Sequence, residues 1–416
     1  MKTSVSSVES GDPSIMSMIE ALAAISETKD GLTRRYLTAE HRRANDLVHE
    51  WMTSAGMKVW QDAAGNVIGR YEGEREGLPA VMIGSHLDTV VNAGRYDGML
   101  GVVTGIDCVR SLEHRGLRLP FAVEVIGFAD EEGARFQSTY LGSRAVAGTF
   151  DTKLLSRRDQ EGTSMADAMR DFGLEPARIG EAARDPGDVL AYLELHIEQG
   201  PILEAEGIAA GVVTAIAGAT RLAVMVDGLA GHAGTVPMGL RRDALAAASE
   251  CVLALERIAA SHPSTVGTVG QMSVLPGASN VVPGRVMFSI DLRAAEDSFR
   301  QAAMNELYIR LNEIAARRNV EIFREIVHEA PSVACSDAIM TRIEDALSAE
   351  GQRVLRLASG AGHDAAAMAD LTDVGMIFLR CEGGLSHNPD EAITESDALT
   401  GARILLRVLE NFDAET

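Results

Sequence analysis

The sequence has little of what marks disulfide-stabilised, nucleic-acid-binding and membrane proteins. Its four cysteines are scattered without a Cys-x-x-Cys pair, which favours reduced, buried thiols over a disulfide framework or a zinc knuckle. The formal charge of −22 disfavours a nucleic-acid partner, because Lys and Arg supply the affinity for phosphate backbones. No stretch reaches the roughly 20 apolar residues that span a bilayer, and Met1 to Asp12 has no apolar signal segment. We therefore expect a cytoplasmic protein without a membrane partner.

The chain is instead rich in apolar segments that alternate between strand and helix patterns. Hydrophobic residues make up 46% of its 416 residues, enough for more than one core. We predict an α/β protein in which a discontinuous catalytic domain (1–216 and 330–416) carries an inserted domain (217–329). Within the insert the predicted order is β-α-β-β-α-β, with a single strand over 266–274, which is typical of a ferredoxin-like unit.

Four predicted strands of the catalytic domain are each followed by a histidine or a carboxylate. Open α/β sheets place their sites at the carboxyl ends of parallel strands, so we expect these side chains to converge. A single acidic run also suits a solvated helix N-terminus, but four such strand ends together predict a metal centre. The candidate ligands are His86 and Asp97 after strand 80–84, Glu132 after strand 121–129, His196 after strand 190–195 and His387 after strand 375–380.

Three imidazoles and two carboxylates suffice for two divalent ions if one carboxylate bridges them, and we assign the bridge to Asp97. Mixed nitrogen and oxygen ligands suit zinc, manganese, cobalt or nickel better than magnesium. Asp88, two residues after His86, is placed to accept the other N–H of that imidazole. Glu131, beside Glu132, is left free to take a proton from water at the metals. Such a centre favours hydrolysis of an amide-type bond.

Other imidazole and acidic side chains are not assigned to the centre. Glu194 is interpreted as a structural acid next to His196. A single histidine is more often a hydrogen-bonded core or surface residue than a metal ligand. We give that interpretation to His41, His49, His114, His262 and His328.

Several motifs, in order along the chain, resemble the hydantoinase/carbamoylase group of the M20 dinuclear metallohydrolases. The resemblance runs from about Gly31 to the last helix. The group includes N-carbamoyl-L-amino-acid hydrolases, allantoate and ureidoglycolate amidohydrolases, and β-ureidopropionases. The motifs are Gly84-Ser-His-Leu-Asp-Thr-Val, Tyr96-Asp-Gly, Asp130-Glu-Glu-Gly, Glu194-Leu-His-Ile-Glu-Gln-Gly-Pro, Gly231-His-Ala-Gly-Thr-Val-Pro-Met and Ser386-His-Asn-Pro.

The resemblance implies two divalent metals per subunit on the same five ligands, Glu131 as general base, and a lid domain that mediates homodimer formation. It also implies that His232 stabilises the oxyanion, although from the sequence alone His232 is a loop residue capping a turn. Arg293 is suited to bidentate capture of a substrate carboxylate. Closure of the lid is expected to complete the site. The implied substrate contacts are Gln199, His232, Asn280, Arg293, Gly362 and His363.

The expected reaction is cleavage of the ureido C–N bond of an N-carbamoyl-L-amino acid, releasing the L-amino acid, ammonia and carbon dioxide. Allantoate stays open as the alternative substrate, followed by ureidoglycolate and N-carbamoyl-β-alanine. An M20 exopeptidase is disfavoured, because the wider clan usually lacks the run Glu194-Leu-His-Ile-Glu-Gln-Gly. An inactive scaffold is disfavoured because every ligand and the base are present. The sequence leaves open the metal, and whether His232 acts within its own subunit.

Overall fold

A computed structural model describes residues 12–413 of the chain. The prediction made for Met1 to Asp12 concerns residues that, except for Asp12, lie outside this range. The chain forms two compact units: unit 1 comprises the segments up to Val213, Cys335–Leu357 and from His363 onward, and unit 2 comprises Thr214–Ala334 and Ala358–Gly362. No helix within residues 12–413 is long and apolar enough to cross a membrane.

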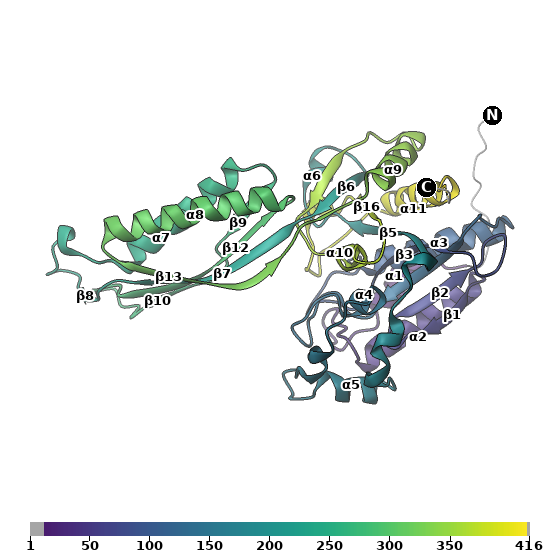
Figure 1. Ribbon diagram of the computed structural model, residues 1–416, viewed down its shortest axis with the longest axis horizontal. Helices are drawn as coiled ribbons and strands as arrows, with labels where there is room; N and C mark the ends of the chain where they lie inside the picture. The colour runs from purple at the N-terminus through teal and green to yellow at the C-terminus, as the bar shows by residue number, and fades with distance from the viewer. Residues whose placement is uncertain (1–11, 414–416) are drawn as a thin grey trace. The chain divides into compact units, whose positions relative to one another are not determined.

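Unit 1 is built on a mixed β-sheet (Figure 1). Its strands are β1 (Lys58–Gln61), β2 (Val67–Tyr71), β3 (Ala80–His86), β4 (Ala122–Phe128), β5 (Val189–Ile197), β6 (Ala210–Ile216), β15 (Arg356–Ser359) and β16 (Val374–Leu379). They follow the order β1-β2-β4-β3-β5-β16-β6, and β15 also pairs with β6; the short strand β14 (Val333–Ala334) extends the sheet by pairing with the end of β6. The four strands β3, β4, β5 and β16 run parallel, whereas β2 and β6 are antiparallel to their neighbours. The predicted α/β class is confirmed.

Helices cover both faces of this sheet. The helices of unit 1 are α1 (Ile15–Ala23), α2 (Ala39–Ser54), α3 (Met99–His114), α4 (Leu141–Val146), α5 (Met165–Asp171), α6 (Ile202–Ala205), α9 (Asp337–Ala349), α10 (Asp364–Met368) and α11 (Glu395–Glu410). Glu194 of β5 accepts a hydrogen bond from the backbone of Ala365 in α10, whereas Leu195 lies against Gly401 of α11. Successive strand residues point to opposite faces, so α10 and α11 lie on opposite sides of the sheet.

Several helices begin where a hydroxyl side chain caps the first turn. Ser14 precedes α1, Thr38 precedes α2 and Thr394 precedes α11, and each side chain accepts a backbone N–H three residues later. Such caps satisfy N–H groups that have no partner inside the helix. These helices therefore start at residues that the local sequence specifies.

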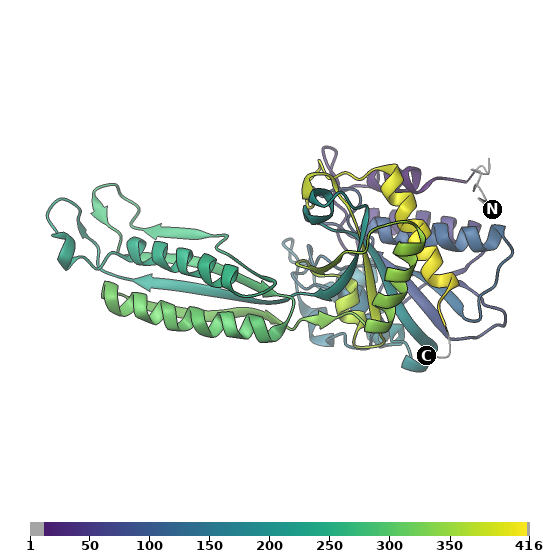
Figure 2. The ribbon, with the colours of Figure 1, turned by 90° about the horizontal axis from the view of Figure 1, so that it is seen from above.

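Unit 2 contains two long helices on one face of an antiparallel sheet (Figure 2). Its elements are β7 (Gly218–Asp227), β8 (Gly231–His232), α7 (Ala244–Ser261), β9 (Thr265–Thr268), β10 (Met272–Leu275), β11 (Val281–Val282), β12 (Arg285–Ala294), α8 (Asp297–Arg318), β13 (Glu321–Ala330) and β14 (Val333–Ala334). The sheet order is β10-β12-β7-β13, with β9 also paired to β12, and β8 pairs with β11. Alternate residues of β7, namely Leu222, Val224 and Val226, join the core shared with α7 and α8.

The prediction of one strand over 266–274 is wrong, because the structure divides this segment into β9 and β10. Thr268 pairs with Asp291, and Met272 pairs with Phe288. The three residues 269–271 therefore lie opposite only two residues of β12. The backbone N–H of Gln271 bonds to the Ser289 hydroxyl at 3.1 Å. The surplus residue interrupts the ladder, as in a β-bulge.

Candidate metal centre

The carboxyl ends of the four parallel strands of unit 1 bring the predicted ligands to one edge of the sheet. His86 is the last residue of β3, and His196 is the penultimate residue of β5. Glu131 and Glu132 follow β4, and His387 follows β16 after a short turn. The structure therefore brings together side chains that lie up to about 300 residues apart in the sequence, as parallel strands require.

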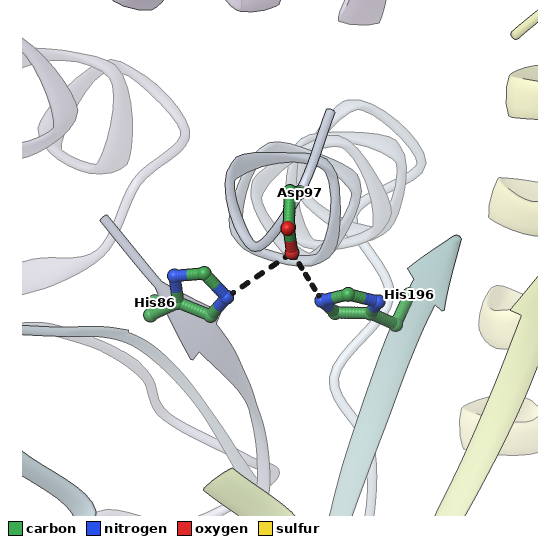
Figure 3. Close-up of side chains that lie close together, drawn as sticks. All are labelled: His86, Asp97 and His196. Atoms are coloured by element: carbon green, nitrogen blue, oxygen red, sulfur yellow. Dashed lines mark ion pairs between the residues drawn. The ribbon is translucent and has the colours of Figure 1, made fainter. Parts of the chain in front are cut away.

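Asp97 lies at the centre of these side chains. Its Oδ1 is 3.5 Å from Nε2 of His86 and 3.1 Å from Nε2 of His196, and Figure 3 shows both imidazoles pointing toward it. Its Oδ2 is 3.1 Å from Nε2 of His387, which is in turn 3.4 Å from Oε1 of Glu132. Two groups of three donors thus share Asp97, one with His86 and His196 and the other with Glu132 and His387.

The orientation of the buried imidazoles fits a cation. Nδ1 of His86 lies 3.0 Å from the backbone oxygen of Asp88, and Nδ1 of His196 lies 2.9 Å from that of Ile197. A ring that donates its Nδ1–H to a carbonyl directs the lone pair of Nε2 outward, which is the usual arrangement of a metal-bound histidine. In both rings Nε2 faces an oxygen of Asp97, so a cation bound between them would take the place of a proton shared by the two groups.

Close packing at the start of α3 also shapes this cluster. Gly98 precedes the helix with φ 75°, and a Cβ there would lie 2.5 Å from three atoms of the His86 ring. Glycine adopts this backbone conformation without the penalty that other residues meet. Gly98 therefore leaves the space that His86 occupies.

The charges of Asp97 and the imidazoles depend on one another. Burial raises the pKa of the Asp97 carboxyl, but hydrogen bonds with His196, His387 and His86 outweigh burial and hold it well below its usual range. Burial lowers the pKa of the His86 imidazole, and hydrogen bonds with Asp88 and Asp97 more than reverse this. Contact with Asp97 raises the pKa of His387 to about 9. The imidazoles thus stabilise an ionised Asp97.

Glu131 and Glu132 carry the opposite perturbation. Burial, followed by the charge of Glu132, raises the pKa of Glu131 well above its ordinary value. Burial and the charge of Asp97 raise the pKa of Glu132 to about 7. Ionising both glutamates therefore requires additional positive charge, which divalent cations would supply.

Asp88 connects the segments that follow β3 and β4. The Asp88 carboxylate lies 3.5 Å from Nδ1 of His86, whereas the backbone oxygen of Asp88 lies closer to that nitrogen, at 3.0 Å. The same carboxylate accepts the backbone N–H groups of Glu131 at 2.9 Å and Glu132 at 3.2 Å. Asp88 thus orients the two glutamates as well as His86.

The substrate-contact candidates of unit 1 lie beside the centre. Nε2 of Gln199 donates to Oδ2 of Asp97 at 3.0 Å. His363 is buried with its ring edge-on to His196, at 4.5 Å between centroids. Glu194, which we left out of the ligand set, accepts hydrogen bonds from Ser85 and from the backbone of Ala365. It also forms a third possible donor group with His196 and His363.

The predicted substrate-contact residues of unit 2 lie at two separate places in that unit. His232 pairs with Val281, and the backbone oxygen of Asn280 accepts the N–H of Ala233, so His232 and Asn280 are neighbours. Arg293 instead donates to both carboxylate oxygens of Asp291, at 2.9 and 3.0 Å, and to the backbone oxygen of Gly360 at 2.7 Å. Gly362 ends the short segment that contains Gly360.

Sequence reasoning did not single out Glu391. This acid is 2% exposed and accepts the backbone N–H groups of Tyr96 at 2.8 Å and Asp97 at 3.1 Å. It follows His387 by four residues in a polar loop, where no periodicity separates it from a solvated acid. No sequence signal was available to find it.

An open sheet that gathers histidines and carboxylates into two donor groups around one aspartate is typical of metal-dependent hydrolases. Comparison with known proteins leads to the same class. Residues 82–411 match Peptidase family M20/M25/M40. The chain belongs to this family.

Relatives within the family are similar over nearly their whole length. An N-carbamoyl-L-amino acid amidohydrolase of Geobacillus stearothermophilus is 45% identical, covering 90% of this chain and 92% of the relative. Allantoate deiminase 1 of Glycine max is 40% identical, covering 94% and 87%. The crystal structure of a hydantoinase/carbamoylase family amidase from Burkholderia multivorans has a TM-score of 0.90 at 34% identity, covering 95% of this chain and 96% of that one. The resemblance expected from the motifs is confirmed.

Proposed function

We propose that the protein is an amidohydrolase that uses two divalent cations to cleave the ureido C–N bond of N-carbamoyl-L-amino acids. The observation that carries the proposal is the pair of donor groups that share Asp97 next to Glu131. The relatives named N-carbamoyl-L-amino acid amidohydrolase support the substrate class. Allantoate is the second candidate, supported by the similarity to allantoate deiminases.

In this proposal the cations, zinc or manganese with cobalt or nickel as further options, are held by His86, Asp97, Glu132, His196 and His387. Once bound, they would activate a water molecule and polarise the ureido carbonyl. Glu131 takes the proton of the attacking water and passes it to the leaving nitrogen. Its buried carboxylate has a raised pKa, which suits a group that must both accept and release a proton.

His232 is proposed to stabilise the oxyanion. Its Nδ1 accepts the N–H of Gly234 at 3.1 Å, which places the ring proton on Nε2 as a donor. A donor directed at a developing negative charge is what oxyanion stabilisation requires. The remaining substrate contacts proposed are Gln199, Asn280, Arg293, Gly362 and His363.

Unit 2 supports the proposal of a homodimer. Arg285 pairs with Asp227 at the end of β12 nearer to His232, and Arg293 lies eight residues further along that strand. At about 3.4 Å per residue this separates the two ends by about 27 Å, farther than a carbamoyl amino acid reaches. If His232 and Arg293 contact one substrate molecule, they come from two copies of the chain.

The lid proposed for residues 217–329 has features of a ferredoxin-like dimerisation domain. The sheet order β10-β12-β7-β13 and the helices α7 and α8 support the ferredoxin-like arrangement. Within residues 12–413, strand β13 pairs only with β7, and it exposes Phe323, Ile326 and Val327. The unpaired backbone groups of an edge strand are a template for pairing with another chain, so we propose β13 as part of the dimer contact.

A substrate panel tests the function. The purified protein, loaded with manganese or zinc, is given N-carbamoyl-L-amino acids, N-carbamoyl-β-alanine, allantoate, ureidoglycolate and dipeptides, and ammonia and amino-acid release are measured. Turnover of N-carbamoyl-L-amino acids is expected. Turnover of allantoate alone would favour the second candidate, and release of amino acids from dipeptides alone would contradict both.

A further inference from the structure

A buried acid outside the predicted ligand set connects the segments that carry Asp97 and His387. Oε1 of Glu391 accepts the backbone N–H groups of Tyr96 at 2.8 Å and Asp97 at 3.1 Å. Oε2 of Glu391 accepts the hydroxyl of Ser386, the residue before His387, at 2.9 Å. One carboxylate thus holds the main chain on one side of the centre and a side chain on the other.

The surrounding backbone is shaped around this carboxylate. A Cβ at Gly94 would lie 2.2 Å from the carboxyl carbon of Glu391, so no larger residue fits there without moving the acid. The N–H of Glu391 bonds to the backbone oxygen of Asn388 at 3.0 Å, which closes the turn after His387. Glu391 therefore occupies a defined position.

The Ser386 hydroxyl has one proton and two acidic neighbours. It lies 2.9 Å from Oε2 of Glu391 and 3.2 Å from Oδ2 of Asp97, and it accepts from Nε2 of Gln199 at 3.1 Å. A hydroxyl donates only one hydrogen bond, so the two carboxylates compete for it. The shorter contact is to Glu391, which leaves the oxygen of Asp97 free of this donor.

Two residues of this network have a backbone conformation that is costly outside glycine. The φ angles of Gln199 and His387 are 57° and 53°, in the left-handed region. Such conformations are strained for residues other than glycine and persist only where the surrounding contacts hold them. The hydrogen bonds of Ser386, which link Gln199 to Glu391, are among those contacts.

We propose that Glu391 is a positioning residue of the metal centre. It fixes the main chain of Asp97 and takes the proton of Ser386, so that Oδ2 of Asp97 keeps one side-chain donor, Gln199, instead of two and retains a lone pair for a cation. The inference rests on the proposed function, because it assumes that divalent ions bind at Asp97. Glu391 itself is assigned no contact with metal or substrate.

The substitution Glu391→Gln tests the proposal in the full-length protein. Glutamine keeps an oxygen for the two backbone N–H groups but presents an NH₂ group to Ser386, whose proton must then turn to Asp97. Loss of such an outer partner costs about 10- to 100-fold in metal affinity. We expect that increase in the dissociation constants of Zn²⁺ and Mn²⁺, measured by competition with a chromogenic chelator. Excess metal should restore kcat, which a general loss of structure would not allow.

Two further variants provide a control for the lost charge and test whether the effect of Glu391→Gln depends on Ser386. Asp390→Asn removes the same charge from the exposed neighbouring residue, and its metal affinity should stay within about twofold of wild type. In a Ser386→Ala background, Glu391→Gln should lower the affinity by no more than about threefold, because the effect passes through the Ser386 proton. A full loss in that background would contradict the proposed path.

The outcomes separate this inference from the proposed function. If the wild type binds no divalent ion, the proposed function fails. If the wild type binds ions and Glu391→Gln binds them equally well, only the role of Glu391 is overturned. If Glu391→Gln does not fold, Glu391→Asp replaces it, since its shorter side chain keeps the charge but cannot span all three donors. Unchanged metal affinity in folded Glu391→Asp would also overturn the role.

Discussion

His41 is expected to make unit 1 sensitive to acid. The side chain is fully buried in α2, its Nδ1 accepts the N–H of Leu37 at 3.1 Å, and its ring stacks on Phe172. Its Nε2 has no hydrogen-bond partner within residues 12–413. Burial lowers the pKa of His41 from 6.5 to about 3. The unfolded chain therefore takes up a proton below pH 6.5 that the folded chain refuses until about pH 3, so stability falls as the pH falls through this window.

The size of the effect follows from the two pKa values. The free energy of unfolding falls by about 1.4 kcal/mol for each pH unit below 6.5. Between pH 7 and pH 5, His41 alone therefore lowers it by about 2 kcal/mol. The variant His41→Asn keeps an acceptor for Leu37 but has no proton to gain in this range. Its lost ring packing lowers stability equally at both pH values, and the other histidines titrate in both proteins, so both contributions cancel in the comparison.

Urea unfolding followed by tryptophan fluorescence measures the difference. Both tryptophans, Trp51 and Trp60, belong to unit 1, so the signal reports on that unit. Wild type should lose about 2 kcal/mol more than His41→Asn between pH 7 and pH 5. Parallel losses, within about 0.5 kcal/mol, would refute the inference that the folded protein keeps His41 neutral.

Three other substitutions test the centre and the substrate contacts. Glu131→Gln should lower kcat by about 10²- to 10⁴-fold with bound metal unchanged, and intact turnover would exclude Glu131 as the base. Gly98→Ala should bind less metal, as measured by elemental analysis, because its Cβ would collide with the His86 ring. Gly77→Ala is the control, since Gly77 has the same φ of 75° but no atom within 4 Å of the added Cβ, and this variant should keep its metal. Full metal content in Gly98→Ala would contradict the prediction. Arg293→Lys should raise KM for carboxylate substrates by about 10- to 100-fold but not for a neutral amide analogue, and an equal rise for both would contradict the carboxylate contact.

The parts of the centre that could be predicted are those with a local sequence signal. Buried strands that end in His86 and His196 are visible as apolar runs, and the parallel arrangement brings their ends together without further information. The structure shows this convergence, while the role of these residues as metal ligands stays a prediction. Gly270 was a weak signal of the bulge between β9 and β10, since a glycine inside a strand pattern suggests one, but the surplus residue itself is seen in the pairing with β12.

Other contacts depend on tertiary structure. Glu391 meets Tyr96, 295 residues earlier in the chain, and nothing near Glu391 in the sequence indicates that partner. Arg293 is different, since Asp291 lies two residues away on the same face of β12 and could have been considered as its partner. The sequence interpretation gave Arg293 only a substrate carboxylate, whereas the structure pairs it with Asp291.

The division of the chain also has a consequence for protein synthesis. The polypeptide passes between the two units four times, and residues 214–334 are complete before β16 is made. Strand β16 must then enter the sheet between β5 and β6. Until it does, β5 is an open edge of a half-finished sheet, which is prone to pair with other chains. A nascent chain that stalls after residue 334 should therefore expose an aggregation-prone edge on β5.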